Sequence, residues 1–466
     1  MDSAPAATAR GEQRSAPRRT IRKRDVLRSL GEPKVAVMLL LGFSSGLPFF
    51  LSGNTLGYWL RDAGTTLAAI GFISWVGLAY SLKFLWAPII DRVDAPLAAR
   101  LGRRRSWMLV SQVIVGLALT AMAMIGLGAG VLAIGVLALA LAFSSSTQDI
   151  VIDAWRIEVA TDGDELGMLS SAYQLGYRVA ILMTEAVILI LANHFGWRFS
   201  YGVMAALMVV GIGATFVAME PHRVPAPGAS PTATAPLTTI RGLVDAIVSP
   251  FSEFFRAHGP LAILMLAMIS FYQLGDYFSA PMYNPYYHDL GLSKDVVGTV
   301  RASVGTVATI VGIAAAGLSA ARFGYLRTLV AGVLIKSAAI ANFALLAWAG
   351  PSVGLFSAVM FADNFGIGFA GVALVTYMST LTSVGYTATQ YALLSSTYTY
   401  IGKFSKGFSG VTVEHLAAGR TLLDGYALFF VVSGLLGLPA LVLCLVLARA
   451  TKAAGGPEGP PLRTSA

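Results

Sequence analysis

Apolar segments long enough to cross a membrane follow one another along most of this chain. From Val35 to Ala448 the sequence consists of nearly continuous apolar stretches, separated by short polar or Gly/Pro-rich breaks. A transmembrane helix needs about 20 mostly apolar residues. Only 12% of the residues are charged, whereas soluble domains carry about 25%, and the mean hydropathy is +0.70. The sequence therefore predicts an all-α integral membrane protein.

The breaks divide these stretches into twelve predicted spanning helices, six on each side of a linker. The linker, Glu220–Arg241, is rich in Pro, Ala and Thr and cannot span a membrane. The segment that follows it, Gly242–Gly259, has the pattern of an amphipathic helix lying on the membrane surface. The helices are predicted at 34–59, 67–90, 106–127, 130–155, 166–193, 197–218, 260–287, 295–320, 325–348, 352–381, 386–412 and 422–448.

Basic residues predict the orientation of the chain. They crowd the tail before the first helix and recur after the second, at Arg100 and Arg103–Arg105. By the positive-inside rule both segments face the cytoplasm, and an even number of helices leaves both termini there. The net charge of +9 thus reflects topology, and we expect no nucleic-acid partner. The predicted domains are a disordered basic cytoplasmic tail (1–33), an N-terminal six-helix bundle (34–219), a cytoplasmic linker with an amphipathic helix (220–259), a C-terminal six-helix bundle (260–449) and a disordered cytoplasmic tail (450–466).

Charged residues interrupt one of the most apolar helices. Within LAFSSSTQDIVIDAWRIEV (Leu141–Val159), Asp149, Asp153 and Arg156 share one helical face. A charge at the bilayer centre costs about 2.5–3.5 kcal/mol even on insertion scales, so such residues predict a function. Because the pattern recurs in several helices, it indicates a transporter.

The two halves carry a short internal repeat. LSSAYQLGYR (Leu169–Arg178) aligns without gaps to LSSTYTYIGK (Leu394–Lys403), in the fifth predicted helix of each half. Two six-helix halves related by a parallel repeat are typical of the major facilitator architecture. The alignment places Arg178 and Lys403 at equivalent depths, close to the middle of the membrane.

Several blocks carry a resemblance to a known family. GFISWVGLAYSLKFLWAPIIDR, followed by LGRRRSWM, resembles the loop between helices 2 and 3 of major facilitator transporters, except that about ten residues separate Asp91 and Gly102. With GFSSGLPFFLSGNTLGYWLRDAG and STQDIVIDAWRIE, these blocks resemble the AmpG family of muropeptide permeases. The likeness is strong over roughly residues 42–200. The second half agrees in layout and in QLGDYFSAPMY (Gln273–Tyr283).

This resemblance implies a transporter and not an enzyme. It implies proton-driven import of N-acetylglucosaminyl-anhydromuramyl peptides across the inner membrane of a Gram-negative cell, for peptidoglycan recycling. In some bacteria these fragments also signal β-lactamase induction, and hence antibiotic resistance. The expected partners are the glycopeptide and membrane lipid. We expect a monomer without a cofactor, in which the proton gradient supplies the driving force.

A carrier for such a solute needs cations for carboxylates, and rings and amides for sugars. Arg178 and Lys403 fit the first need, although each could instead pair with a neighbouring acid, and pairing is the expectation for Lys336. Tyr286 and Tyr287 are predicted to belong to an interfacial aromatic belt. The predicted substrate-binding residues are Asn54, Gln148, Arg178, Gln273, Asp276, Tyr277, Tyr398 and Lys403.

Proton coupling needs a carboxyl group that can gain and lose a proton. Burial disfavours the charged form, while a nearby cation favours it. Asp149 is the preferred carrier because it lies in a block that resembles the family. The alternative is a structural ion pair with Arg156, Lys83 or Arg178. The candidates for proton coupling are Asp149, Asp276, Asp363 and Glu185.

A further charged group is assigned to a cytoplasmic gate. Its members lie near the predicted cytoplasmic ends of helices 2, 3 and 4, where basic residues also fix the topology. Pro281 and Pro285 are expected to break helix 7 near its outer end. The predicted gate consists of Asp91, Arg92, Arg103, Arg104, Arg105, Asp153 and Arg156.

Other functions remain open at this stage. The diverged second half leaves room for a transporter of another amphiphilic anion, such as a drug, nucleotide or acyl-CoA. A muropeptide sensor that moves nothing is a second alternative. A membrane-embedded hydrolase would need a reactive cluster, and the sequence has no metal-spaced histidines and no Walker A motif. The histidines are scattered at His194, His222, His258, His288 and His415.

Overall fold

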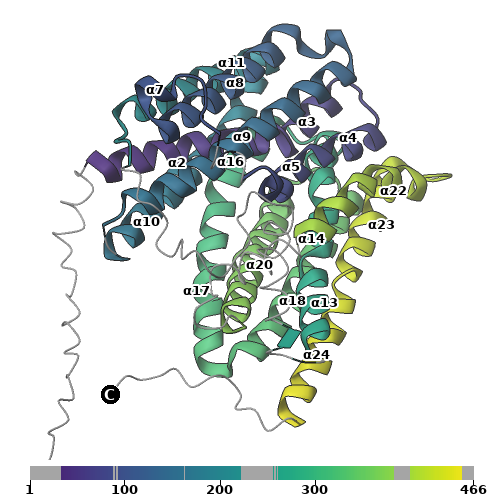
Figure 1. The fold of residues 1–466 in the computed structure, drawn as a ribbon. Coiled ribbons are helices and arrows are strands. Elements are labelled where there is room, and N and C mark those ends of the chain that lie inside the picture. The colour runs from purple at the N-terminus through teal and green to yellow at the C-terminus, as the bar shows by residue number, and fades with distance from the viewer. Residues whose placement is uncertain are drawn as a thin grey trace, which may run out of the picture.

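Two helical bundles make up the protein. The computed structural model describes residues 33–87, 90, 93–161, 163–221, 255–256, 259, 261–381 and 399–453, and within them every regular element is a helix. The N-terminal bundle, purple to teal in Figure 1, lies above the C-terminal bundle, green to yellow. Most of the linker and most of the predicted amphipathic helix lie outside the described residues.

The N-terminal bundle follows the predicted order of spans, with breaks inside several of them. The first span is α2 followed by α3, and the second is built from four short pieces. Its elements are α2 (Pro33–Leu51), α3 (Asn54–Asp62), α4 (Leu67–Ile73), η1 (Ser74–Gly77), α5 (Leu78–Leu82), η2 (Lys83–Leu85), α7 (Ala98–Leu101), α8 (Arg103–Ile125), η3 (Gly126–Ala129), α9 (Val131–Val159), α10 (Gly163–Leu182), the π-helical turn η4 (Met183–Val187) and α11 (Ile188–Val217).

The C-terminal bundle repeats this plan. Its first span is again broken, and a π-helical turn, η6, lies in its second. Its elements are α13 (Leu261–Tyr272), α14 (Leu274–Ser279), η5 (Ala280–Met282), α15 (Tyr283–Asp289), α16 (Lys294–Val300), η6 (Arg301–Gly305), α17 (Thr306–Phe323), α18 (Tyr325–Ala341), α19 (Phe343–Ala349), α20 (Val353–Thr380), η7 (Lys406–Phe408), α22 (Ser409–Leu416), α23 (Leu422–Leu435) and α24 (Leu438–Ala453).

Nine of the described helices are long and apolar enough to cross a membrane. The longest, Met168–Val217, contains two predicted spans, because the chain reverses at Gly196, where φ is +80°. Only glycine adopts such a φ without strain. Helix 7 is interrupted near Pro281, as predicted, by the 3-10 turn η5. The predicted helical membrane protein is therefore confirmed.

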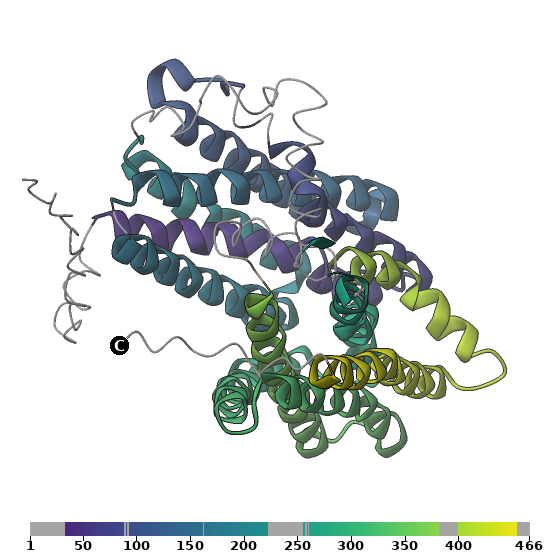
Figure 2. The same cartoon turned by 60° about the horizontal axis from the view of Figure 1, so that its bottom comes forward.

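The bundles meet at one end and diverge at the other. We call the side where α2 begins the Pro33 side, and the side where α3 ends the Asp62 side. On the Asp62 side, α3 packs against α15, α4 against α22, and α11 against α16. The two views show the bundles separating towards the Pro33 side (Figures 1 and 2). The two bundles therefore contact each other on the Asp62 side.

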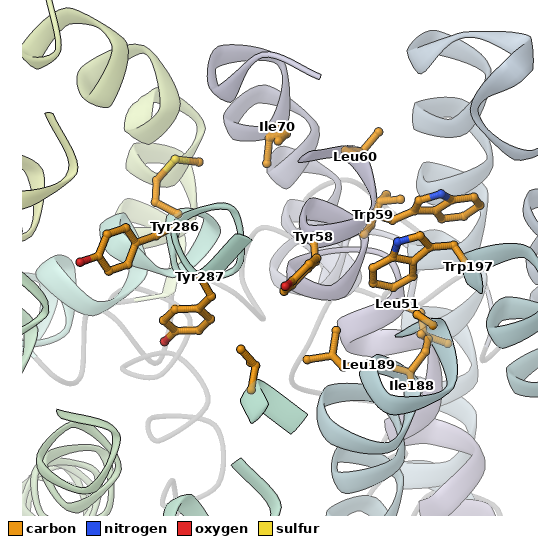
Figure 3. Close-up of a cluster of buried hydrophobic side chains, with 14 of the residues drawn as sticks. Leu51, Tyr58, Trp59, Leu60, Ile70, Ile188, Leu189, Trp197, Tyr286 and Tyr287 are labelled. Atoms are coloured by element: carbon orange, nitrogen blue, oxygen red, sulfur yellow. The ribbon is translucent and has the colours of Figure 1, made fainter. Parts of the chain in front are cut away.

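Close packing and aromatic side chains hold this junction together. A Cβ atom at Gly298 would lie 2.7 Å from the Ala186 carbonyl oxygen, so only glycine lets α16 approach η4 this closely. Tyr58 and Trp197 of one bundle belong to the same buried cluster as Tyr286 of the other (Figure 3). The cluster is a core that both bundles share.

The prediction of an interfacial aromatic belt at Tyr286 and Tyr287 is wrong. Both side chains are almost fully buried, and Tyr286 Oη donates a hydrogen bond to the Phe343 carbonyl oxygen at 2.8 Å. Their place near a helix end suggested the belt. However, that end packs inside the protein, against the core of the junction.

Candidate functional site

Asp149 accepts a hydrogen bond from a hydroxyl group of a neighbouring helix. It lies in α9, where Ser45 Oγ of α2 donates a hydrogen bond to its Oδ1. Ser45 Oγ also lies 2.8 Å from Tyr173 Oη of α10. The helices α2 and α10 approach so closely because Gly176 has no side chain, and a Cβ atom there would overlap the Leu39 carbonyl oxygen. Glycine packing thus brings the Ser45 hydroxyl group to this carboxyl, and the Tyr173 hydroxyl group to Ser45.

The cations considered as partners of Asp149 make their short contacts with other groups. Arg156 Nη2 lies 3.0 Å from Asp153 Oδ1, and Lys83 Nζ lies 3.9 Å from Asp153 Oδ2. Arg178 is exposed. Within the part of the chain that the structure describes, no cation lies within 4.0 Å of the Asp149 carboxylate, so the structural ion pair is not found there.

Lys403 crosses from the C-terminal bundle towards the N-terminal one. It is 8% exposed, and its Nζ lies 5.9 Å from the centre of the Tyr80 ring. Lys406 Nζ lies 2.7 Å from the point where a Cβ atom would sit on Gly77. Nearby, Trp75 Nε1 donates a hydrogen bond to the Phe404 carbonyl oxygen at 2.8 Å. The two lysines therefore reach the second span of the other bundle.

Lys336 pairs with two acids, as predicted. Its Nζ lies 2.8 Å from Asp276 Oδ1 and 3.0 Å from Asp363 Oδ1. Lys336 and Asp363 are buried, whereas the Asp276 side chain is 32% exposed. Two predicted proton carriers thus share one cation, and one of them remains accessible.

A chain of hydrogen bonds joins four helices close to the junction. Arg301 of η6 donates to Asn284 Oδ1 at 2.6 Å and to the Glu185 carbonyl oxygen at 3.3 Å. Asn284 Nδ2 donates to the Asn54 carbonyl oxygen at 2.5 Å. Asn54 also lines a small cleft, together with Pro281. The structure thus brings Asn54 and Glu185 into one network across the bundles.

The other predicted binding residues occupy different surroundings. Gln148 is fully buried, and its Nε2 donates to Ser44 Oγ at 2.8 Å. Gln273 and Tyr277 are partly buried, and the Tyr277 ring packs against Gly402. Tyr398 lies outside the described residues. The predicted equivalence of Arg178 and Lys403 does not extend to their burial.

The predicted gate residues that the structure describes have contacts inside the N-terminal bundle. Arg104 Nε lies 3.0 Å from Glu158 Oε2, and Arg103 Nη2 lies 3.9 Å from Glu158 Oε1. Arg105 donates to the Thr215 carbonyl oxygen at 3.1 Å. The Asp153–Arg156 pair lies on the same Pro33 side. Asp91 and Arg92 lie outside the described residues.

The sequence reasoning missed a charged cluster on the Asp62 side. Arg61 Nε lies 2.7 Å from Asp289 Oδ1, and Lys294 Nζ lies 2.6 Å from Asp62 Oδ2. His288 lies between the two acids, 3.3 Å from Asp62 Oδ1 and 3.0 Å from Asp289 Oδ1. Asp62 and Asp289 each end the first span of a half, which is the signal that could have found them.

Comparison with known proteins identifies the family to which the chain belongs. The family model described as Major Facilitator Superfamily matches residues 38–405. The chain belongs to this superfamily. It is 34% identical over 422 residues to the anhydromuropeptide permease of Escherichia coli K12, covering 90% of this chain and 81% of that protein. It is also 29% identical to the putative transporter AmpG 4 of Rickettsia felis, covering 88% and 95% respectively.

Solved structures of other members of the superfamily share the fold. A bacterial homologue of the lysosomal transporter Spinster, in an inward-facing and unoccupied conformation, superposes with a TM-score of 0.65, covering 92% of this chain and 99% of that one at 15% identity. A peptide transporter in complex with sulfate also gives 0.65, covering 94% and 100% at 14% identity. Together, the family match and the permease relative show that the chain is a transporter of this superfamily and not an enzyme. Among the described residues, no group of three His, Cys, Asp or Glu side chains could hold a metal ion.

Proposed function

We propose that this protein imports anhydromuropeptides, N-acetylglucosaminyl-anhydromuramyl peptides, from the periplasm into the cytoplasm. The observation that carries the proposal is the 34% identity to the Escherichia coli anhydromuropeptide permease over 90% of the chain. The buried ammonium group of Lys403 supports it, because the peptide part of such a substrate carries carboxylates.

The orientation follows from charge. Arg100 and Arg103–Arg105 lie on the Pro33 side, which the positive-inside rule assigns to the cytoplasm. The Asp62 side then faces the periplasm of the inner membrane. The bundles are joined on that side, as expected for a carrier open to the cytoplasm in an alternating-access cycle.

Transport is driven by protons in this proposal. Asp149 is the first candidate carrier, since it accepts a hydrogen bond from the Ser45 hydroxyl group and no described cation lies within 4.0 Å of it. Such a carboxyl can be neutral at little cost, whereas a paired one is held ionised. Asp276, Asp363 and Glu185 are the further candidates.

The test is uptake of labelled anhydromuramyl-tripeptide disaccharide into proteoliposomes, with and without an inward proton gradient. Accumulation driven by the gradient is expected. Equilibration that ignores the gradient would keep the substrate and remove the coupling. Binding without any uptake would indicate a sensor, and neither binding nor uptake by the folded protein would favour another amphiphilic anion.

A further inference from the structure

We propose that Lys83, Lys403 and Lys406 form one carboxylate-binding site between the bundles, and that this site shares its cations with Asp149. The proposal rests on the proposed function, which it deepens by naming the group of the substrate that is bound. The site takes an anion with at least two carboxylates, such as the peptide part of a muropeptide.

The lysines form one electrostatic cluster drawn from both bundles. Lys83 belongs to η2 of the N-terminal bundle, and Lys406 begins η7 of the C-terminal bundle. Lys403 interacts electrostatically with both of them and with Asp149. The elements meet because η7 packs against η1 and α4, where Gly77 leaves room for the Lys406 ammonium group.

The cluster lacks the negative charge that it needs. Among the described residues, neither Lys403 nor Lys406 has a carboxylate within 4.0 Å. Lys83 reaches only Asp153, at 3.9 Å, and that carboxylate is already held by Arg156 at 3.0 Å. Lys83, Lys403, Lys406 and Arg156 carry four positive charges, whereas the carboxylates that interact with them, Asp149 and Asp153, carry two negative ones, so two positive charges remain in excess. Buried charges of one sign are costly unless an opposite charge joins them.

An anionic ligand supplies that charge. Lys403 is more than nine-tenths buried, with its ammonium group above the Tyr80 ring, so it is already positioned and largely desolvated. The Lys83 side chain is 36% exposed, which leaves one edge of the cluster open. Hydrogen bonds between ammonium and carboxylate groups are about twice as strong as neutral ones. A ligand bound here would contact both bundles at once.

Sharing cations with Asp149 couples this site to protons. The ionised carboxylate of Asp149 and the carboxylates of the ligand are attracted to the same ammonium groups. A proton on Asp149 removes its negative charge and leaves the ammonium groups to the ligand. The ligand therefore binds more tightly when Asp149 is protonated, and by reciprocity the ligand favours protonation. This is the sign that symport requires. The titratable groups that face Asp149 are Lys83, Asp153, Lys403, Tyr80, Tyr173 and Tyr177.

The experiment measures binding to the purified full-length protein by calorimetry at pH 5.5 and 7.5. The probes are anhydromuramyl-tripeptide disaccharide, the same compound with its carboxylates converted to amides, and citrate. The variants are Lys403→Gln, Lys403→Arg, Lys406→Gln and Asp149→Asn. Arg322→Gln is the matched control, because Arg322 is exposed at the end of α17, away from the cluster. Thermal unfolding checks that each variant is folded.

The expected result is selective for carboxylates. Lys403→Gln and Lys406→Gln should each lower the affinity for the acid probe about tenfold, which is about 1.4 kcal/mol. The affinity for the amide probe should not change. Lys403→Arg should largely restore binding. Wild type should bind the acid more tightly at pH 5.5, whereas Asp149→Asn should show that tighter affinity at both pH values.

Two outcomes with the variants would overturn the site. One is equal weakening of the acid and amide probes, and the other is an Arg322→Gln effect as large as that of Lys403→Gln. If wild type binds the amide probe as tightly as the acid, the site fails while the proposed function stands. If neither glycopeptide binds but citrate does, and depends on Lys403, the proposed function fails while the lysine site stands. If none of the three probes binds, both are wrong.

Discussion

Arg61 and Asp289 join the two bundles through a two-point contact. Arg61 Nε, one residue before the end of α3, lies 2.7 and 2.8 Å from the two carboxylate oxygens of Asp289, at the end of α15. Tyr426 Oη donates to the same carboxylate at 2.8 Å. Because the two partners belong to different bundles, this contact must break whenever the Asp62 side opens.

Asp289→Asn should therefore favour opening on the Asp62 side. Loss of a partly buried charged contact costs about 1.5–3 kcal/mol, which is tenfold or more in population. The measurement is maleimide labelling of Leu292→Cys, a buried position whose carbonyl oxygen accepts a hydrogen bond from Tyr58 of the other bundle, in a background where the single cysteine, Cys444, is replaced by alanine. Asp94→Asn, an exposed acid on the Pro33 side, is the control. Equal labelling in both variants would show that Asp289 does not hold the junction.

Asp149→Asn should abolish proton-driven accumulation and leave counterflow exchange largely intact. An amide cannot release a proton, but it can still accept the hydrogen bond from Ser45. Both activities are measured in the same proteoliposomes. If exchange is lost together with accumulation, Asp149 has a structural role instead.

Lys336→Met should strongly destabilise the C-terminal bundle. It leaves Asp363 buried without its cation, and breaking a buried pair from one side costs about 3–5 kcal/mol. The apparent Tm of the purified protein should fall. The double variant Lys336→Met/Asp363→Asn should recover part of that loss, because it removes the stranded charge. A double variant no more stable than the single one would contradict this account.

Gly176→Ala should force α2 and α10 apart. The added methyl group would overlap the Leu39 carbonyl oxygen, and overpacking typically costs about 1–3 kcal/mol. Gly135→Ala is the matched control, since nothing lies within 4 Å of its Cβ position and alanine is the better helix former. A lower Tm is expected for the first variant only. The same loss in both would indicate a backbone effect rather than a packing effect.

The spans could be predicted from the sequence because each is a local property. The length of an apolar stretch and the glycine or proline residues that interrupt it determine where a helix spans the membrane. The interruption of helix 7 near Pro281 could therefore be predicted as well. The expectation that Lys336 pairs with an acid followed from the cost of an isolated charge in the membrane.

Contacts between the bundles could not be predicted in this way. Arg61 and Asp289 are 228 residues apart, and nothing local to either indicates the other. Arg156 and Lys83 were considered as partners of Asp149, yet they face Asp153, one turn further along the same helix. Helical spacing gives the shared face, but the rotation and depth of neighbouring helices decide which acid a cation reaches.

The aromatic core shared by the bundles gives the transport cycle a thermal signature. Opening the Asp62 side must separate Tyr58 and Trp197 from Tyr286, and so hydrate rings that are now buried. Exposing apolar surface to water raises the heat capacity. The free energy of opening is therefore a curved function of temperature. The relative populations of the conformations closed and open on the Asp62 side consequently depend on temperature.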